Sequence, residues 1–225
     1  MAYLHSDREQ FRDAIDLAYE QTGVMVQAIE KDYYVTMLLR LLAQRMPYIV
    51  FKGGTSLSKC HKVIRRFSED IDITIDTLLS QGQKKKIKQA IVESAEELGM
   101  TIENLDETRS RRDYNRYVIA YDSVIPMASD ALKAAVLLET SYTAVSFPTV
   151  LLPVHSYIGD MMEQEAPDAI EEYNLILLVN FSSWELCHPW NCVSRIERLL
   201  RIWQFHPDVQ NGTSSCCPPA KILCM

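Results

Sequence analysis

The sequence predicts an α/β fold in which a small mixed β-sheet is flanked by helices, with the N-terminal helices packed on it. Three observations lead to this prediction. Apolar residues recur at helical spacing through residues 7–45. A short β-rich run and a Gly-Gly turn then separate these helices from the next one. Residues 70–75 alternate strictly between polar and apolar, which is typical of a strand with one buried face.

Length and composition are those of a globular protein. The 225 residues suffice for one large domain or two small ones, and 48% of them are hydrophobic. The net charge of −7 argues against a general nucleic-acid coat protein, so any nucleic acid must meet a local basic patch. No apolar run approaches the ~20 residues of a membrane span, and the polar N-terminus does not resemble a signal peptide. We therefore expect a cytoplasmic protein with no membrane association.

Local signals set the order of the elements. Ser6 and Glu9 form a capping box, which predicts a helix over residues 7–22 that ends at Gly23. A second helix is expected over residues 26–45. Strands are then expected over residues 48–51, 70–75, 100–103, 114–121 and 134–142, and helices through residues 57–64 and over residues 80–98.

The composition changes after about Tyr173, where helical periodicity fades and cysteine, tryptophan and proline accumulate. We therefore divide the chain into a domain over residues 1–175 and an atypical C-terminal tail over residues 176–225. The tail is expected to be poorly ordered or to result from a shifted reading frame. Only Cys60 of the six cysteines precedes the tail. A zinc cluster in the tail is one interpretation, although the cysteine spacings miss the usual zinc patterns.

The Gly53-Gly54 turn is a candidate phosphate-binding site. Glycine lets the backbone approach a phosphate closely, and the start of the following helix offers N–H groups and a positive dipole end. The hydroxyl groups of Thr55 and Ser56 would add donors, and Lys59 would add a positive charge. A plain turn between a strand and a helix is the alternative.

Asp70 and Asp72 are candidate metal ligands. They stand two residues apart in the predicted strand, so their side chains project to the same side. Adjacent carboxylates repel one another unless a cation neutralises them, and Mg²⁺ prefers oxygen ligands and also binds substrate phosphates. The alternative is a polar strand face exposed to water, although aspartate is a poor strand former.

Glu139 is a third candidate. It stands in an apolar, strand-like run, where a charge requires a partner or a metal. A glutamate at the edge of a strand is the alternative.

Together these motifs resemble the DNA polymerase β nucleotidyltransferase superfamily, in which a Gly-Gly turn, a helix and Asp-x-Asp on the next strand follow in order. Residues 51–59 (FKGGTSLSK), 66–72 (RFSEDID) and 29–35 (IEKDYYV) are similar to the AbiEii/AbiGii-type toxin nucleotidyltransferases. The resemblance covers roughly residues 10–165. The family continues with an Arg-Thr-Phe-x-Glu-Lys-like helix that is absent here, so a lysine that the family uses is missing.

This resemblance implies a nucleotidyltransferase core and Mg²⁺-dependent transfer of a nucleoside monophosphate from a nucleoside triphosphate to an acceptor hydroxyl. Asp70 and Asp72 would hold Mg²⁺, and Glu139 would complete the metal shell and help to deprotonate the acceptor. The residues expected at the triphosphate are Gly53, Gly54, Thr55, Ser56 and Lys59.

The resemblance also implies a toxin that acts beside a protein antitoxin, with RNA as a possible acceptor. Arg109, Arg111, Arg112 and Arg116 could contact RNA phosphates, or they could lie in a solvated loop. Two other functions are left open by the sequence. One is a nucleotide-binding module without turnover, and the other is a zinc-binding interaction protein built on the tail cysteines.

Overall fold

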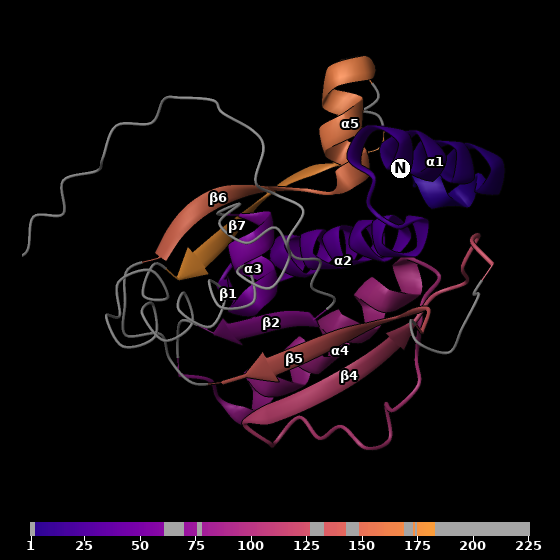
Figure 1. The fold of residues 1–225 in the computed structure, drawn as a ribbon. Coiled ribbons are helices and arrows are strands. Elements are labelled where there is room, and N and C mark those ends of the chain that lie inside the picture. The colour runs from indigo at the N-terminus through magenta and orange to yellow at the C-terminus, as the bar shows by residue number, and fades with distance from the viewer. Residues whose placement is uncertain are drawn as a thin grey trace, which may run out of the picture. The chain divides into compact units, whose positions relative to one another are not determined.

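The computed structural model of the protein describes residues 3–60, 70–75, 78–126, 133–142, 149–168, 173 and 175–182 (Figure 1). All of them belong to one compact unit, residues 1–184. The tail cysteines, for which a zinc cluster is one interpretation, and all of residues 183–225 lie outside the described residues.

The chain begins with two helices that form successive layers. The first, α1 (Arg8–Thr22), follows the short 3-10 turn η1 (Leu4–Ser6). Its N-cap is Asp7 rather than the expected Ser6, because the Asp7 carboxylate accepts the backbone N–H groups of the second and third residues after it. Gly23 ends α1 as predicted, with a left-handed φ of 67°.

Helix α2 (Val26–Arg45) has the predicted bounds and is buried along most of its length. It packs on the sheet, while α1 packs on α2 and on α5 (Tyr157–Glu165). The predicted packing of the N-terminal helices thus holds directly for α2 and through α2 for α1. The charged side chains of a helix that is buried in this way need partners. Two such side chains, Glu30 and Asp32, are described with the site below.

The sheet is mixed, as predicted. Within the described ranges it contains seven strands in the order β3-β4-β5-β2-β1-β7-β6. The central strand β2 runs antiparallel to β1 and parallel to β5. The strands are β1 (Ile49–Lys52), β2 (Asp70–Ile75), β3 (Thr101–Ile102), β4 (Tyr114–Ala120), β5 (Ala135–Ser141), β6 (Thr149–His155) and β7 (Ile176–Ser182).

The two faces of the sheet have different roles. On β2, the side chains of Ile71, Ile73 and Ile75 are buried in the hydrophobic core. The core lies between the sheet and helices α2 and α4 (Gln81–Glu97), which cover this face (Figure 1). The side chains at the alternate positions of β2, beginning with Asp70, project from the opposite face. That face carries the candidate site.

Besides the short η1, three elements were not predicted, namely β6, α5 and β7. Strand β7 extends the sheet to Ser182, beyond the boundary expected near residue 175. It lies between β1 and β6, parallel to β1 and antiparallel to β6. Among the helices that the structure describes, none is both long and apolar enough to cross a membrane.

Candidate active site

Four charged side chains form a row across the centre of the sheet. Asp72 on β2 is paired in register with Lys52 on β1 and with Glu139 on β5. Glu139 is paired in turn with Arg116 on β4. Residues paired in this way project from the same face, and neighbouring strands are about 4.8 Å apart. The row therefore places two carboxylates side by side between two cations, and we call it the carboxylate row.

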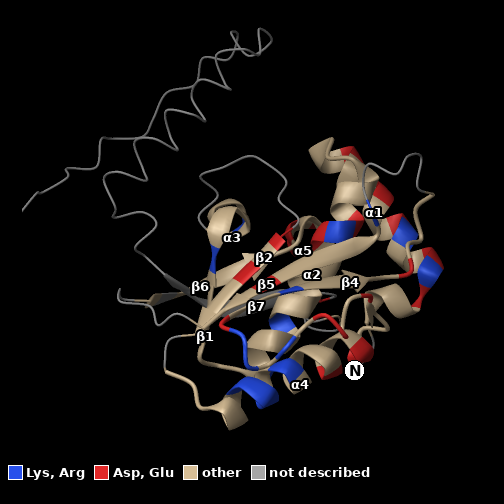
Figure 2. Cartoon of the chain, turned by 90° about the horizontal axis from the view of Figure 1, so that it is seen from below, with Lys and Arg blue, Asp and Glu red and all other residues tan. Residues whose placement is uncertain are grey.

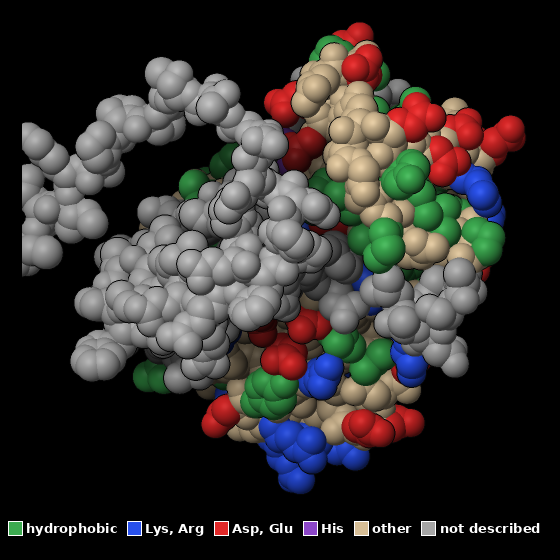
Figure 3. All heavy atoms as spheres, in the orientation of Figure 1, with side chains coloured by type: hydrophobic (Ala, Val, Ile, Leu, Met, Phe, Trp, Pro, Cys, Tyr) green, Lys and Arg blue, Asp and Glu red, His purple; other side chains and the backbone are tan. Residues whose placement is uncertain are grey.

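Asp70 adds a third carboxylate to this row. It precedes Asp72 by two residues on β2, so both project from the same face of the sheet. Figure 2 shows these acidic positions on β2, close to α3. On the surface, acidic side chains gather beside a basic one where β2, β5 and β4 lie (Figure 3). Three oxygen ligands on two rigid strands are a donor set that suits Mg²⁺.

The glycine turn lies directly against Asp72. Helix α3 (Gly53–Lys59) starts immediately after β1. Gly53 has a φ of 80°, which residues with a side chain rarely adopt. A Cβ atom at Gly53 would lie 2.0 Å from Oδ2 of Asp72, so any other residue would displace the carboxylate. Glycine is therefore needed here twice, for the backbone conformation and for the approach to Asp72.

The hydroxyl groups next to this turn stabilise it from within. Thr55 donates to the backbone carbonyl of Asp70, and Ser56 donates to the carbonyl of Gly53 at 2.6 Å. Both side chains are buried. We expected them to donate to a phosphate, whereas the structure shows them tying α3 to the start of β2 and closing the first turn of the helix.

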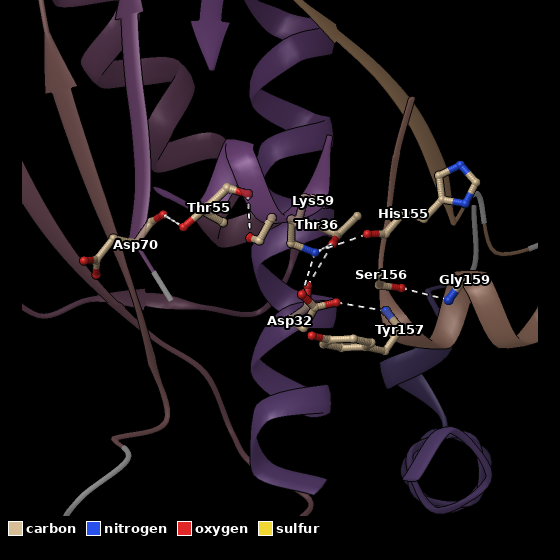
Figure 4. Close-up of polar contacts among 10 residues, drawn as sticks. Asp32, Thr36, Thr55, Lys59, Asp70, His155, Ser156, Tyr157 and Gly159 are labelled. Atoms are coloured by element: carbon tan, nitrogen blue, oxygen red, sulfur yellow. Dashed lines mark hydrogen bonds and ion pairs between the residues drawn. The ribbon is translucent and has the colours of Figure 1, made fainter. Parts of the chain in front are cut away.

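Lys59 lies elsewhere than expected for a phosphate ligand. Its ammonium group lies 2.6 Å from the Asp32 carboxylate on α2, and it donates to Thr36 Oγ1 at 2.8 Å and to the His155 carbonyl at 3.2 Å. Figure 4 shows these three contacts on one side of α3, with the Asp70 carboxylate directed away from them. Three acceptors use the three protons of the ammonium group, so Lys59 joins α3, α2 and β6.

Two acidic residues of α2 thus hold the scaffold together. Asp32 also accepts the backbone N–H of Tyr157 at 2.9 Å, which fixes the start of α5. Two residues earlier on α2, Glu30 accepts hydrogen bonds from the hydroxyl of Ser123 at 2.5 Å and from the N–H of Val124 at 2.7 Å. Burial raises the pKa of the Glu30 carboxyl, while these hydrogen bonds oppose the increase.

Glu139 lies between Asp72 and Arg116 in the row and has further contacts of its own. Its side chain is 30% exposed, and the guanidinium of Arg116 lies 3.7 Å from its carboxylate. Partial burial and a hydrogen bond to Glu139 raise the pKa of the Tyr114 hydroxyl, which is also on β4. Arg116 therefore belongs to the carboxylate row, and not to the loop that carries the other three arginines.

The loop before β4 is held to the fold by other residues. Asn115 accepts the backbone N–H of Arg109 at 2.9 Å and donates to its carbonyl at 3.1 Å. Lys84 lies 2.6 Å from Asp113 at the end of this loop. Arg109, Arg111 and Arg112 are exposed there, and the guanidinium groups of Arg109 and Arg112 also donate to backbone carbonyls of the same loop.

Sequence reasoning missed Lys52. It precedes Gly53 and is paired with Asp72, and its ammonium group donates to Ser141 Oγ at 3.0 Å. A signal was present, since a lysine before a Gly-Gly turn stands at the same end of its strand as the turn. Its position beside the carboxylates depends on the β1–β2 register, which the sequence does not reveal.

Comparisons with known proteins assign the chain to a family. The family profile described as "Nucleotidyl transferase AbiEii toxin, Type IV TA system" matches residues 36–173, more than half of the chain. No curated protein is significantly similar to this chain. Among solved structures, MenT4, a nucleotidyltransferase toxin from Mycobacterium tuberculosis H37Rv, matches with 21% identity and a TM-score of 0.40. That match covers 61% of this chain and 47% of MenT4, so the chain spans about half the length of that protein. By the extent of the profile match, the chain belongs to the AbiEii family of nucleotidyltransferase toxins.

Proposed function

We propose that the protein transfers a nucleoside monophosphate from a nucleoside triphosphate to an acceptor hydroxyl, with Mg²⁺ held by Asp70, Asp72 and Glu139. The observation that carries the proposal is the register of β2 and β5. It places Glu139 beside Asp72 on the face from which Asp70 also projects. The family match supports the same reaction class.

In this reaction the three carboxylates hold the metal, and Mg²⁺ supplies positive charge to the phosphate oxygens when it is bound. Glu139 accepts the proton of the acceptor hydroxyl, for which its partly exposed position in the row is suited. The absence of a side chain at Gly53 makes room for the Asp72 carboxylate beside the start of α3, where the triphosphate would bind. Lys52 and Arg116 supply positive charge on either side.

The test is transfer of label from nucleoside triphosphates, in the presence of Mg²⁺, to total RNA. Glu139→Gln should lower transfer by about a hundredfold or more, the effect expected for loss of a general base. Nucleotide binding should largely survive. The matched control is Glu103→Gln, which makes the same change at an exposed side chain beyond β3, at the far edge of the sheet.

Two results would refute the proposal. One is equal transfer by the parent and Glu139→Gln. The other is Mg²⁺-dependent nucleotide binding by the parent with no release of pyrophosphate, which would identify a nucleotide-binding module instead.

The partners are proposals of the same kind. We infer that the protein acts in the cytoplasm as the toxin of a toxin–antitoxin pair, because it belongs to the AbiEii family. RNA is the proposed acceptor, and the exposed Arg109, Arg111 and Arg112 are its proposed phosphate contacts. Replacing all three by alanine should weaken RNA binding and flatten its dependence on salt. If the salt dependence of RNA binding is unchanged, the three arginines do not contact RNA phosphates and are simply solvated loop residues.

A further inference from the structure

A histidine and two carboxylates converge where β6 meets α5, apart from the carboxylate row. Nδ1 of His155 lies 3.1 Å from Oδ1 of Asp160 and 3.6 Å from Oε2 of Glu163. The three atoms all lie within 4.8 Å of one another. Ligands around a tetrahedral zinc ion are about 3.3 Å apart, given bonds of about 2.0–2.1 Å. The three atoms are slightly more widely spaced than this, so small side-chain rotations would bring them around one ion.

The His155 nitrogen is buried without a hydrogen bond. Nδ1 is shielded from solvent, and its contact with Asp160 does not have hydrogen-bond geometry. Nδ1 makes no hydrogen bond to any other described residue. Buried polar atoms of this kind are few in native proteins, and each requires an explanation. Here the nitrogen is surrounded by carboxylate oxygens. A cation would satisfy the nitrogen and also offset the repulsion between the two acids.

The backbone that carries these ligands is held firmly. The carbonyl of His155 accepts from Lys59, and Ser156 caps α5 by accepting the N–H of Gly159 at 2.9 Å (Figure 4). Asp160 and Glu163 are three residues apart on α5 and therefore share one face of the helix. The ligands come from a strand end and a helix, which position side chains more accurately than loops do.

We propose that His155, Asp160 and Glu163 form a site for a divalent transition-metal ion of the zinc class, with water as the remaining ligand. One imidazole nitrogen and two carboxylates suit zinc, whereas Mg²⁺ prefers oxygen ligands alone. Asp160 is 39% exposed and Glu163 is 55% exposed, so an ion can enter from solvent. The ion would join the end of β6 to α5, and the proposal is independent of the reaction proposed above.

The test measures zinc binding to the chelator-treated full chain, by competition with a chromophoric chelator in excess Mg²⁺. The parent should bind one equivalent more zinc than either His155→Gln or Glu163→Gln. Glu163 is exposed, so its replacement leaves the fold intact, and circular dichroism checks both variants. Glu165→Gln on the same helix is the matched control and should bind as the parent does. The double variant Asp70→Asn/Asp72→Asn should also retain this equivalent.

Measuring a difference removes the contribution of any other zinc ligand, including the cysteines beyond residue 186. Cobalt gives a second readout, because an N/O site lacks the thiolate charge-transfer band of a cysteine site. Equal zinc content in the parent and both variants would overturn the proposal. So would a parent that binds no zinc.

Discussion

Lys59 Nζ lies 2.6 Å from the Asp32 carboxylate, and each side chain is only 6% exposed. Removing one member of such a pair leaves the other charge buried and uncompensated. We therefore expect Lys59→Met to lower the free energy of unfolding by roughly 3–5 kcal/mol. Urea denaturation measures this loss.

A double-mutant cycle separates this pair from general packing. Combining Lys59→Met with Asp32→Asn removes both charges, while the asparagine can still accept the N–H of Tyr157. The double variant should lose clearly less stability than the sum of the single variants, because the pair is coupled. Additive losses would show that the two charges act independently.

Gly53 and Gly23 offer a matched comparison of glycine positions. Both have a positive φ, but a Cβ at Gly23 would meet nothing within 4 Å, whereas one at Gly53 would meet Asp72. Gly23→Ala should therefore cost only the conformational penalty, about 1–2 kcal/mol of stability, and leave transfer unchanged. Gly53→Ala should abolish metal binding as well, measured with Mn²⁺ by paramagnetic resonance. Normal Mn²⁺ binding by Gly53→Ala would contradict the contact with Asp72.

Arg116 competes with a metal ion for Glu139. Arg116→Ala should strengthen Mn²⁺ binding, because a positive charge 3.7 Å from one of the ligands is removed. The Arg116 side chain is 53% exposed, so solvent limits the gain to about 0.5–1 kcal/mol, roughly a two- to fivefold lower dissociation constant. Arg12→Ala is the control, since Arg12 is equally exposed and pairs with Asp16 on α1. An unchanged dissociation constant in Arg116→Ala would contradict this role.

His5 makes stability depend on pH. Burial among the rings of Phe11, Tyr33 and Tyr34 lowers the pKa of its imidazole. The unfolded chain then takes up this proton at a higher pH than the folded one does. Stability is thus full above the unfolded value near 6.5 and declines as the pH falls towards the folded value, by up to about 1.4 kcal/mol per pKa unit.

The variant His5→Phe isolates this effect. It is expected to lose less stability than the parent between pH 7.5 and pH 5.5 in urea denaturation, whatever its stability at neutral pH. Parallel losses in the two proteins would show that other groups carry the dependence.

The elements that sequence analysis predicted are those with strong local signals. Helix α4 begins at the capping box of Ser80 and Gln83, and β2 has the predicted bounds because its alternation reflects one buried face. Strand β6 was missed because Pro153 interrupts it, and proline is normally excluded from strands. It is accommodated here because β6 is the last strand of the sheet within the described part of the chain, and proline is tolerated in edge strands.

The candidate site likewise has a part that the sequence predicts and a part that it does not. That Asp70 and Asp72 share a face follows from their spacing alone. The partners of Lys59 could not be predicted, because they lie on α2 and at the end of β6 and meet it only in the folded chain. Arg116 was grouped with the arginines near it in sequence, whereas the register of β4 with β5 separates it from them.

The position of β7 has a consequence for synthesis of the chain. Strand β1 leads into the Gly53 turn and lies between β2 and β7, with Phe51 paired to Phe181. A ribosome must therefore translate more than a hundred further codons after Phe51 before β7 can pair with this side of β1. Until then the nascent chain exposes unpaired backbone groups next to Gly53, where another chain could add a strand. The sheet beneath the carboxylate row can be completed only after residues 176–182 have emerged.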